Sequence, residues 1–479
     1  MKLKHLTSIL LITAIFIVLT TPYSISSPEE LSWSPNIRLT NHAGQDVLSL
    51  LGSGLALDSH NRMHVVAYYS GQLYHIYDNN GFINETVIAQ VQALEKGFDS
   101  RVNIPSIPIV IDKYGVLHVV YQSSDGGDYE IYYTHSTPGG GFITPVKVTD
   151  NNVNDGFPVM AVDGNGVVHI VYQTSELVAA SGPTKITLRY VHSNSDGGFT
   201  TPVNITCPSY PKMSINQDIK IDKNNNVHIA FTAVDGYNPL YNSTVIVYTN
   251  NTGGLFSKYE VLNETYQDLS PSIAIDDNLT VHLVFKGSGA IYSGRIRYQD
   301  LYYVHSINGS FNSSTPVKIS TVSFAHSPRI AISPNNTLNI VFYGWNTTWS
   351  ANYTKVMYIR GVNGTFSREY IIPSQELDQY LPSMTVGSDN EIHIVYMYGD
   401  SSLKASGNIN IFYVTTSSYY PVGVPEPESP ALLFLAIGIG GLIAGITIVL
   451  ILFRKYKRLE KEVWKPRLEE DTGFEEPPP

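Results

Sequence analysis

A motif that recurs seven times constrains this chain more than any other feature. Each copy reads as an apolar strand, a tight polar turn and a second strand of alternating polarity, with successive copies on average about 55 residues apart. The second strand of each copy carries His or Asn at one fixed position, which we call the anchor. The anchors are His64, His118, His169, His228, His282, Asn339 and His393. Asp precedes the anchor by six residues in five copies, whereas Ser333 and Gly387 replace it in the last two. Such a period indicates a fold built by repeating one supersecondary unit.

Each copy also predicts a third and a fourth strand. The third is typified by IYYTHS at 131–136, a Gly-rich turn ending in Phe follows it, and the fourth is typified by PVKVT at 145–149. Four strands in every repeat of this length are typical of radial blades, which leave few exposed sheet edges. We therefore predict an all-β fold, a seven-bladed β-propeller ectodomain over residues 28–416, plus one C-terminal transmembrane helix. A right-handed solenoid is the alternative, but it needs no displaced fourth strand.

The seventh copy ends without a fourth strand of its own. After IFYVTT at 411–416 the chain continues into a Pro-rich segment and has no Gly-Phe turn. The segment NIRLT at 36–40 resembles the fourth strands of the other copies, so we predict that it closes the last blade. With Cys207 as the single cysteine, no intramolecular disulfide joins the two ends.

The ends of the chain predict where the protein resides. Two lysines and an apolar run within residues 1–27 indicate a signal peptide, with an uncleaved anchor as the alternative. A stalk at 417–430 leads to residues 431–453, which carry no charge and are long enough to span a hydrocarbon layer of ~30 Å as a helix. Basic residues follow at once, so the tail at 454–479 is expected in the cytoplasm and the propeller outside a single-pass membrane anchor.

The Asn-x-Ser/Thr triplets and the stalk are consistent with an extracellular location. Asn-x-Ser/Thr occurs only before the anchor, at Asn84, Asn204, Asn242, Asn250, Asn263, Asn278, Asn308, Asn312, Asn335, Asn346, Asn352 and Asn363. VPEPES at 424–429 resembles PEP-CTERM-type sorting tails, but the chain continues beyond the basic cluster, which favours permanent anchoring. The absence of disulfides, the many asparagines and the single anchor together suggest an archaeal envelope protein.

The consensus P-x-I-A-x-D, V-H-V-V-Y and I-Y-Y-x-x-S resembles sialidase-type or bacterial-neuraminidase-repeat propellers over residues about 36–416. Their Asp box is echoed by SNSDGGFT at 193–200, with Phe199 in place of Trp. The resemblance implies a glycan-directed fold. Sialidase chemistry would also need three arginines around a carboxylate, a Tyr–Glu nucleophile and an Asp acid/base, and no such set is recognisable. Catalysis is therefore uncertain, and no catalytic residue is assigned.

The recurring Asp and His favour a structural role over a metal site. Such a pair in one blade after another would form a ring of equivalent positions, and a hydrogen bond across the first hairpin accounts for it. DKNNN at 222–226 resembles the start of a calcium loop, but Val234 stands where a bidentate Glu would be required, so we expect a turn. No metal or cofactor is expected.

Candidate binding residues fall into two sets. Aromatic side chains concentrate in the long loops that four-stranded connectivity places opposite the tight turns, at Tyr237, Tyr241, Tyr292, Trp345, Trp349 and Tyr353. Asp218, Lys220 and Arg329 break the small-residue pattern of the first strands, which line the axis. The three charged residues either contact an anionic ligand or form an internal ion-pair cluster, and the aromatic residues either stack on a ligand or pack the loops.

The composition narrows the class of function. A formal net charge of −11 argues against a nucleic-acid surface, which needs clustered Lys and Arg. The preferred interpretation is a membrane-anchored recognition or adhesion protein that binds glycans or envelope proteins through the loop face. The alternatives are a sialidase-like glycoside hydrolase and a passive envelope scaffold.

Overall fold

The structure is a computed structural model, and it describes most of the chain from residue 31 to residue 421. The segments outside the described part within that span are 43–45, 93–105, 125, 179–183, 238–242, 263–268, 289–290, 293–294, 297–298, 323, 346–352, 374–377, 400–408 and 419–420. Every regular element among the described residues is a β-strand. None of the described residues belongs to a helix long and apolar enough to cross a membrane. The predicted signal peptide and the predicted span at 431–453 lie outside the described residues.

The strands pair antiparallel within successive groups, which we number one to seven along the chain. One parallel residue pair also joins group three to group four, Ile186 with Met213, and another joins group five to group six, Gln299 with Phe324. Group one contains β2 (Leu55–Leu57), β3 (Met63–Tyr69), β4 (Gln72–Asn79) and β5 (Phe82–Gln90), and group two contains β6 (Ile109–Ile111), β7 (Leu117–Ser124), β8 (Tyr129–His135) and β9 (Val146–Lys147). Group three contains β10 (Asn154–Val162), β11 (Val168–Leu177), β12 (Thr184–His192) and β13 (Val203–Asn204), and group four contains β14 (Met213–Ile221), β15 (Val227–Val234), β16 (Thr244–Asn250) and β17 (Lys258–Leu262). Group five contains β18 (Leu269–Ile275), β19 (Val281–Ser288), β22 (Gln299–His305) and β23 (Val317–Lys318), and group six contains β24 (Phe324–Ile332), β25 (Leu338–Trp345), β26 (Lys355–Val362) and β28 (Tyr370–Ile371). A short hairpin, β20 (Ile291–Tyr292) and β21 (Arg295–Ile296), is inserted in group five, and β27 (Thr365–Phe366) also pairs with β26.

The seventh group joins the two ends of the folded region. It contains β29 (Asp378–Val386), β30 (Ile392–Gly399), β31 (Ile409–Thr415) and, on the outside, β1 (Ile37–Arg38). Ile37 and Arg38 pair antiparallel with Tyr413 and Phe412, so β1 lies within the segment in which the sequence predicted a closing strand. The side chain of Ile37 packs in one buried cluster with that of Tyr413.

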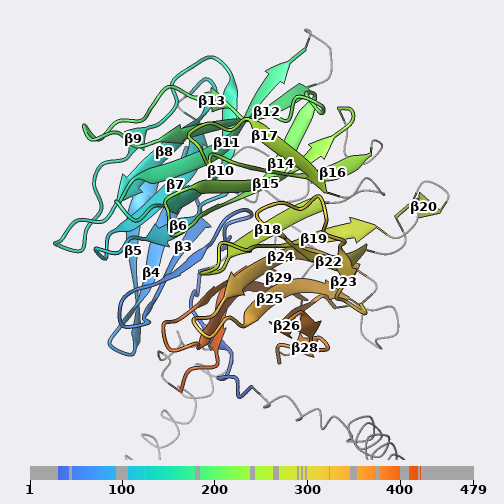
Figure 1. Cartoon of the computed structure of the whole chain (residues 1–479). Helices are drawn as coiled ribbons and strands as arrows, with labels where there is room; N and C mark the ends of the chain where they lie inside the picture. The colour runs from blue at the N-terminus through green and yellow to red at the C-terminus, as the bar shows by residue number, and fades with distance from the viewer. Residues whose placement is uncertain are drawn as a thin grey trace, which may run out of the picture. The chain divides into compact units, whose positions relative to one another are not determined.

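The first strands of the groups form a closed ring. In Figure 1 the groups follow one another around a centre, and the first strand of each group contacts that of the next, from β2 through β6, β10, β14, β18, β24 and β29 back to β2. Apolar side chains of neighbouring groups pack between the sheets in separate buried clusters. This arrangement is a β-propeller, in which the first strands surround the axis.

The predicted contact between the repeated Asp and His is present, but a tyrosine completes it. In group four His228 Nε2 lies 3.2 Å from Asp222 Oδ2, whereas His228 Nδ1 lies 2.6 Å from the hydroxyl of Tyr248. In the four other groups that keep both residues, the carboxylate and the imidazole are 3.4 to 4.0 Å apart. The main partners of Asp222 are backbone N–H groups of its own turn, at Asn224 and Asn226. The prediction of a hydrogen bond is thus confirmed for Asp222 and His228, and elsewhere the contact is longer.

In groups two to five the tyrosine of the third strand also receives an aromatic ring from the next group. Tyr133 meets Phe199 edge to face, and Tyr190 meets Phe256 in the same way. These phenylalanines end the Gly-rich turns found in the sequence. Group seven has no such turn, and Trp33 takes the position against Tyr358 of group six, with ring centroids 5.5 Å apart at 72°. The N-terminal segment therefore supplies both the closing strand and the missing aromatic contact.

A β-bulge recurs where the first strands approach the axis. The register shifts at one position in β10, β14, β18, β24 and β29, and the residue six before the repeated Asp position has a positive φ, as at Phe157, Asn216 and Ser327. In group one the equivalent residue is Gly52, with φ of 68°, where an added Cβ would lie 2.8 Å from Pro108. The bulge re-aims the strand so that the residue two positions after it reaches the axis.

Candidate functional site

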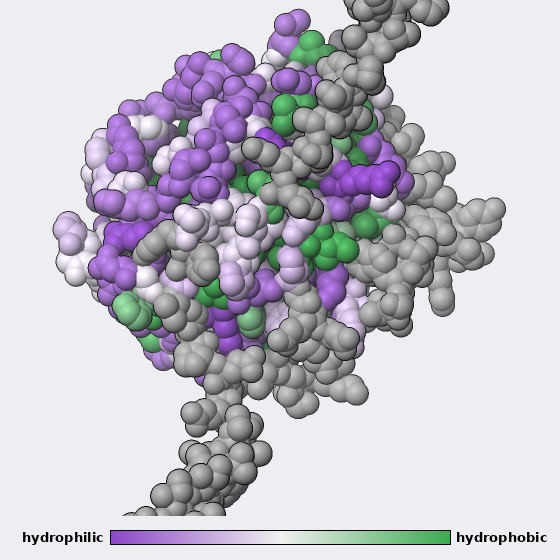
Figure 2. All heavy atoms as spheres, turned by 90° about the horizontal axis from the view of Figure 1, so that it is seen from below, coloured by the Kyte–Doolittle hydropathy of each residue, from purple (hydrophilic) through white to green (hydrophobic). Residues whose placement is uncertain are grey.

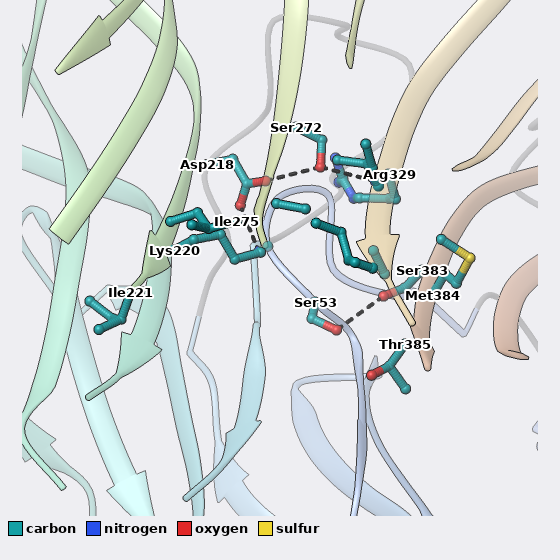
Figure 3. A pocket seen from close by; sticks show the side chains of 15 residues that line it. Ser53, Asp218, Lys220, Ile221, Ser272, Ile275, Arg329, Ser383, Met384 and Thr385 are labelled. Atoms are coloured by element: carbon teal, nitrogen blue, oxygen red, sulfur yellow. Dashed lines mark hydrogen bonds and ion pairs between the residues drawn. The ribbon is translucent and has the colours of Figure 1, made fainter. Parts of the chain in front are cut away.

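A cavity of about 290 Å³ lies on the axis, between the first strands of groups four to seven and the segment before β2. Its lining includes all three charged residues that the sequence placed at the axis, Asp218, Lys220 and Arg329. Figure 3 shows them on the first strands of groups four and six, with the hydroxyl groups of Ser53, Ser272 and Ser383 around them. Asp218, Lys220 and Arg329 thus line one cavity, because equivalent positions of a closed ring face a common axis.

Asp218 is a fully engaged carboxylate. Its Oδ1 accepts a hydrogen bond from the Ile219 N–H at 2.9 Å and lies 3.4 Å from the Lys220 ammonium. Its Oδ2 accepts from the Ser272 hydroxyl and from the Ile273 N–H, both at 3.0 Å. Neutral donors of two strands therefore satisfy most of the acceptor capacity of this buried group.

The two cations of the cavity are less well matched. Lys220 has only two long contacts, to Asp218 and to the Ile219 carbonyl at 3.3 Å, and 40 % of its side chain is exposed. Arg329 donates to two carbonyl oxygens, at 3.2 Å to Pro328 and 2.5 Å to Leu50. Its Nε is buried without a hydrogen-bond partner, and burial lowers the pKa of the guanidinium, an effect that Asp218 partly opposes.

Stacked aromatic rings mark the loop end of group six. The half-buried Trp345 lies with its ring centroid 4.3 Å from Phe324 at 14°, and 5.6 Å from His326 at 19°. His326 stacks in turn on Tyr343, with centroids 5.3 Å apart. A column of parallel rings at the edge of the loop face offers a flat surface of the kind on which sugar rings stack.

Sequence reasoning missed two titratable residues near this column. Lys286 of β19 is buried, and burial lowers its pKa to about 8. Burial lowers the pKa of His326 to about 3, and the charge of Lys286 adds to the effect. The repeat position that Lys286 occupies in group five holds a hydrogen-bond acceptor in other groups. Gln122 accepts from the Phe157 N–H at 2.7 Å, and Thr232 accepts from the Ser270 N–H at 3.2 Å. A lysine cannot accept, and this break in the pattern was the available sequence signal.

Two further aromatic candidates lie beside lysine side chains. Tyr237 is exposed, with the Lys212 ammonium 5.7 Å from its ring, and Tyr353 is half-buried beside Lys355 at 5.8 Å. Tyr292 belongs to the short strand β20. Tyr241 and Trp349 lie outside the described residues. Of the predicted set, the structure thus brings together the axial charges and places Trp345 in the column.

Most of the described glycosylation asparagines reach the surface. The exposed ones are Asn204, Asn278, Asn308, Asn312, Asn335 and Asn363. Asn84 and Asn250 are half-buried, and Asn250 donates to the Tyr248 hydroxyl at 3.2 Å. Asn242, Asn263, Asn346 and Asn352 lie outside the described residues. On the face seen in Figure 2 hydrophilic residues prevail, and hydrophobic residues form small separate groups.

Comparison with known proteins supports the fold and leaves the activity open. No family model matches the chain, and no curated protein matches it in sequence. A PL25 ulvan lyase solved with the sugar unit GlcA(1-4)Rha3S has a TM-score of 0.56 at 10 % identity, over 81 % of this chain and 95 % of the lyase. The polysaccharide lyase Uly1 has a TM-score of 0.50 at 11 % identity, over 77 % of this chain and 90 % of the lyase. At such identities the likeness shows a shared propeller-type fold. A Hadza microbial sialidase also matches, with a TM-score of 0.42 at 12 % identity, over 72 % of this chain and 74 % of the sialidase.

Proposed function

We propose that this protein is an extracellular glycan-recognition protein that binds sugars on the loop face of its propeller. The observation that carries the proposal is the column of parallel rings formed by Phe324, His326 and Trp345. Aromatic faces stack on the C–H faces of sugars, and nearby polar groups then fix orientation. The fold likeness to glycan-active enzymes, one of them solved with a bound sugar unit, supports the same ligand class.

The proposal includes the domain architecture, the membrane topology and the extracellular location expected from the sequence. Each of the seven strand groups is one blade, and the chain has a signal peptide, a glycosylated ectodomain, a stalk, one membrane span and a cytoplasmic tail. The seven copies of the motif and the exposed asparagines support this organisation. Protease treatment of intact cells, followed by detection of a tag after residue 479, tests the topology. A protected tag attached to a short fragment is expected, whereas a protected full-length chain would contradict it.

Binding is tested with the purified full-length chain in detergent on a glycan array. We expect selective binding that Trp345→Ala weakens at least tenfold. Tyr114→Ala is the matched control, because Tyr114 is 68 % exposed in a turn of the opposite face and should not affect binding. Equal binding by Trp345→Ala and the unchanged protein would reject the column as the site, and an empty array would favour a protein partner or a scaffold role.

Glycan cleavage is the second candidate function, with a sialidase-like hydrolase as one form of it. The observation that favours it is the lowered pKa of two residues, Lys286 and His326, which keeps the imidazole neutral and lets the amine lose its proton more readily than an ordinary lysine. Incubation with the glycans that bind, followed by analysis of fragment length, tests it. Cleavage that is lost in both Lys286→Met and His326→Gln would establish an enzyme, and intact glycans after prolonged incubation would leave recognition alone.

A further inference from the structure

The axial cavity holds more positive than negative charge. Two cations, Lys220 and Arg329, face one carboxylate, Asp218, among the described residues that line it. The other lining residues are neutral, and several carry hydroxyl groups, including Ser53, Ser272 and Ser383. A net positive charge in a partly dehydrated space is costly unless a counter-charge occupies it.

The internal ion-pair alternative does not account for Arg329. Lys220 and Asp218 approach to 3.4 Å, but among the described residues no ion pair connects Arg329 to a carboxylate. The oxygens of Asp218 already accept hydrogen bonds from Ile219, Ser272 and Ile273. Arg329 therefore donates hydrogen bonds to neutral carbonyl groups alone, and Asp218 compensates its charge only in part.

Packing does not account for the two cations either. The residues equivalent to Lys220 in four other groups are Ala56, Ala161, Ala274 and Ala331, and those equivalent to Arg329 include Gly54, Ser272 and Ser383. Apart from Asp218, the residues at these two ring positions in the other groups are uncharged. Binding of a ligand in the cavity would account for the two long charged side chains at these positions.

The donors that remain free are suited to a compact oxyanion. Arg329 has five N–H donors, two of which are used in hydrogen bonds, and its Nε is buried without a partner. A guanidinium presents its donors in a plane that matches a carboxylate or a sulfate group. The cavity volume of about 290 Å³ is at the low end for small-molecule sites, so it takes one small group and not a sugar chain.

A second cavity provides a way in from the turn face. It has a volume of about 430 Å³, shares Ser53 and Thr385 with the first cavity, and is lined by aliphatic residues such as Leu57, Ile111 and Val386 beside the turns at Asp58 and Gly387. The axis is therefore hollow from the turns to the charged residues. This route is separate from the aromatic column, which lies at the loop end.

We propose that the axial cavity is a binding site for a single small oxyanion, a carboxylate or sulfate group, held by Arg329 and Lys220. The source is either an inorganic anion or the acidic group of a monosaccharide. The site is independent of the proposed glycan recognition at Trp345, so each proposal stands or fails by its own variant.

The test is thermal unfolding of the full-length protein in detergent, in buffers free of sulfate, phosphate and carboxylate. Sodium sulfate and sodium glucuronate are titrated at an ionic strength held constant with sodium chloride. We expect a saturable rise of the midpoint with at least one of the two, because a ligand that binds only the folded state stabilises it. A rise with sulfate alone identifies an inorganic anion, a rise with glucuronate alone identifies the carboxylate of an acidic sugar, and a rise with both identifies the shared oxyanion chemistry.

Arg329→Met is the decisive variant. We expect it to weaken binding at least about thirtyfold, since it removes a buried charged partner. Without anion its midpoint should equal or exceed that of the unchanged protein, because a buried charge that is only partly compensated has been removed. Arg360→Met, at a half-buried arginine of β26 outside the cavity, is the matched control and should keep the full response. Trp345→Ala should also keep it, which separates this site from the aromatic column.

Three results would overturn the proposal. These are the absence of any saturable response in the unchanged protein, an unaltered response in Arg329→Met, and a loss of response in Arg360→Met as large as in Arg329→Met. If Arg329→Met does not fold, equilibrium dialysis of labelled sulfate and glucuronate against Lys220→Met decides instead. The proposal then requires that Lys220→Met retains less of whichever anion the unchanged protein retains.

Discussion

The residues that replace the repeated Asp, His or Tyr keep the hydrogen bonds of the residues they replace, which shows that these positions form one connected set. In group six Asn339 replaces His and Ser333 replaces Asp: the Asn339 amide donates to the Ser333 hydroxyl at 2.7 Å, and its oxygen accepts from the Tyr358 hydroxyl at 2.7 Å. In group one His75 replaces the tyrosine, and its Nε2 lies 2.9 Å from His64 Nδ1. Each substitution preserves a chain of contacts from the turn to the third strand, so the set acts as an internal support.

Removal of one tyrosine hydroxyl should measure the strength of this support. Tyr190→Phe leaves Nδ1 of the buried His169 without its partner at 2.7 Å. We expect the free energy of unfolding to fall by about 1 to 3 kcal/mol, the cost of an unsatisfied buried polar group. Urea unfolding measures it, with Tyr114→Phe, at an exposed tyrosine, as the unaffected control.

Acid should destabilise the propeller before its carboxylates are protonated. Burial lowers the pKa of His169 and of His393 to about 4, below the unfolded value of 6.5. Because the unfolded chain then binds more protons, stability falls as the pH drops from about 6.5 to about 4, by up to about 1.4 kcal/mol for each unit of pKa shift. Unfolding curves at several pH values measure the slope.

The histidine origin of this slope has its own control within the chain. The double variant Asp163→Ser, His169→Asn copies the neutral pair of group six and removes one of these titrating imidazoles. Its stability should depend less steeply on pH between about 6.5 and about 4. An unchanged slope would mean that His169 does not titrate on unfolding.

At the scale of elements, the N-terminal segment does two tasks that the repeat assigns to different strands. β1 completes the sheet of group seven, and Trp33 replaces the missing phenylalanine against Tyr358. Trp33→Ala should lower the free energy of unfolding by about 3 to 5 kcal/mol, as for other large core truncations. Trp33→Phe should lose much less, since phenylalanine has this role in the other groups; a loss equal to that of alanine would contradict the equivalence. Thermal and urea unfolding measure both.

Sequence patterns predicted the elements well and the site in part. Alternation and spacing indicate strands, and the equivalence of first strands brings Asp218, Lys220 and Arg329 to one cavity, because a repeat converts sequence position into position around an axis. Trp33 lies outside every copy, so no period points to it. The pair of Lys286 and His326 comes from different groups, and its burial follows from packing between sheets, which a single sequence does not express.

On the scale of the whole molecule, the closed ring makes stability a shared property. Each first strand contacts both neighbours, so no group is terminal in the way that the end repeats of an open array are. Deletion of residues 31–41 removes the outer strand of group seven and exposes the edge of β31. We expect the single unfolding transition of the complete chain to broaden or split, with early loss of protection in group seven. Hydrogen exchange followed by mass spectrometry measures this, and a sharp single transition in the deletion variant would show that closure is unimportant.

The pairing of β1 with β31 also sets a time order for biosynthesis. Ile37 emerges from the ribosome early, but its partner Tyr413 is made only near the end of the propeller. At about 5 to 20 residues per second this interval is about 20 to 75 seconds. During it the closing strand has no place to dock, and Trp33 has no Tyr358 to contact until most of that time has passed. A chain that stops short of its seventh group therefore leaves β1 without its partner strand β31.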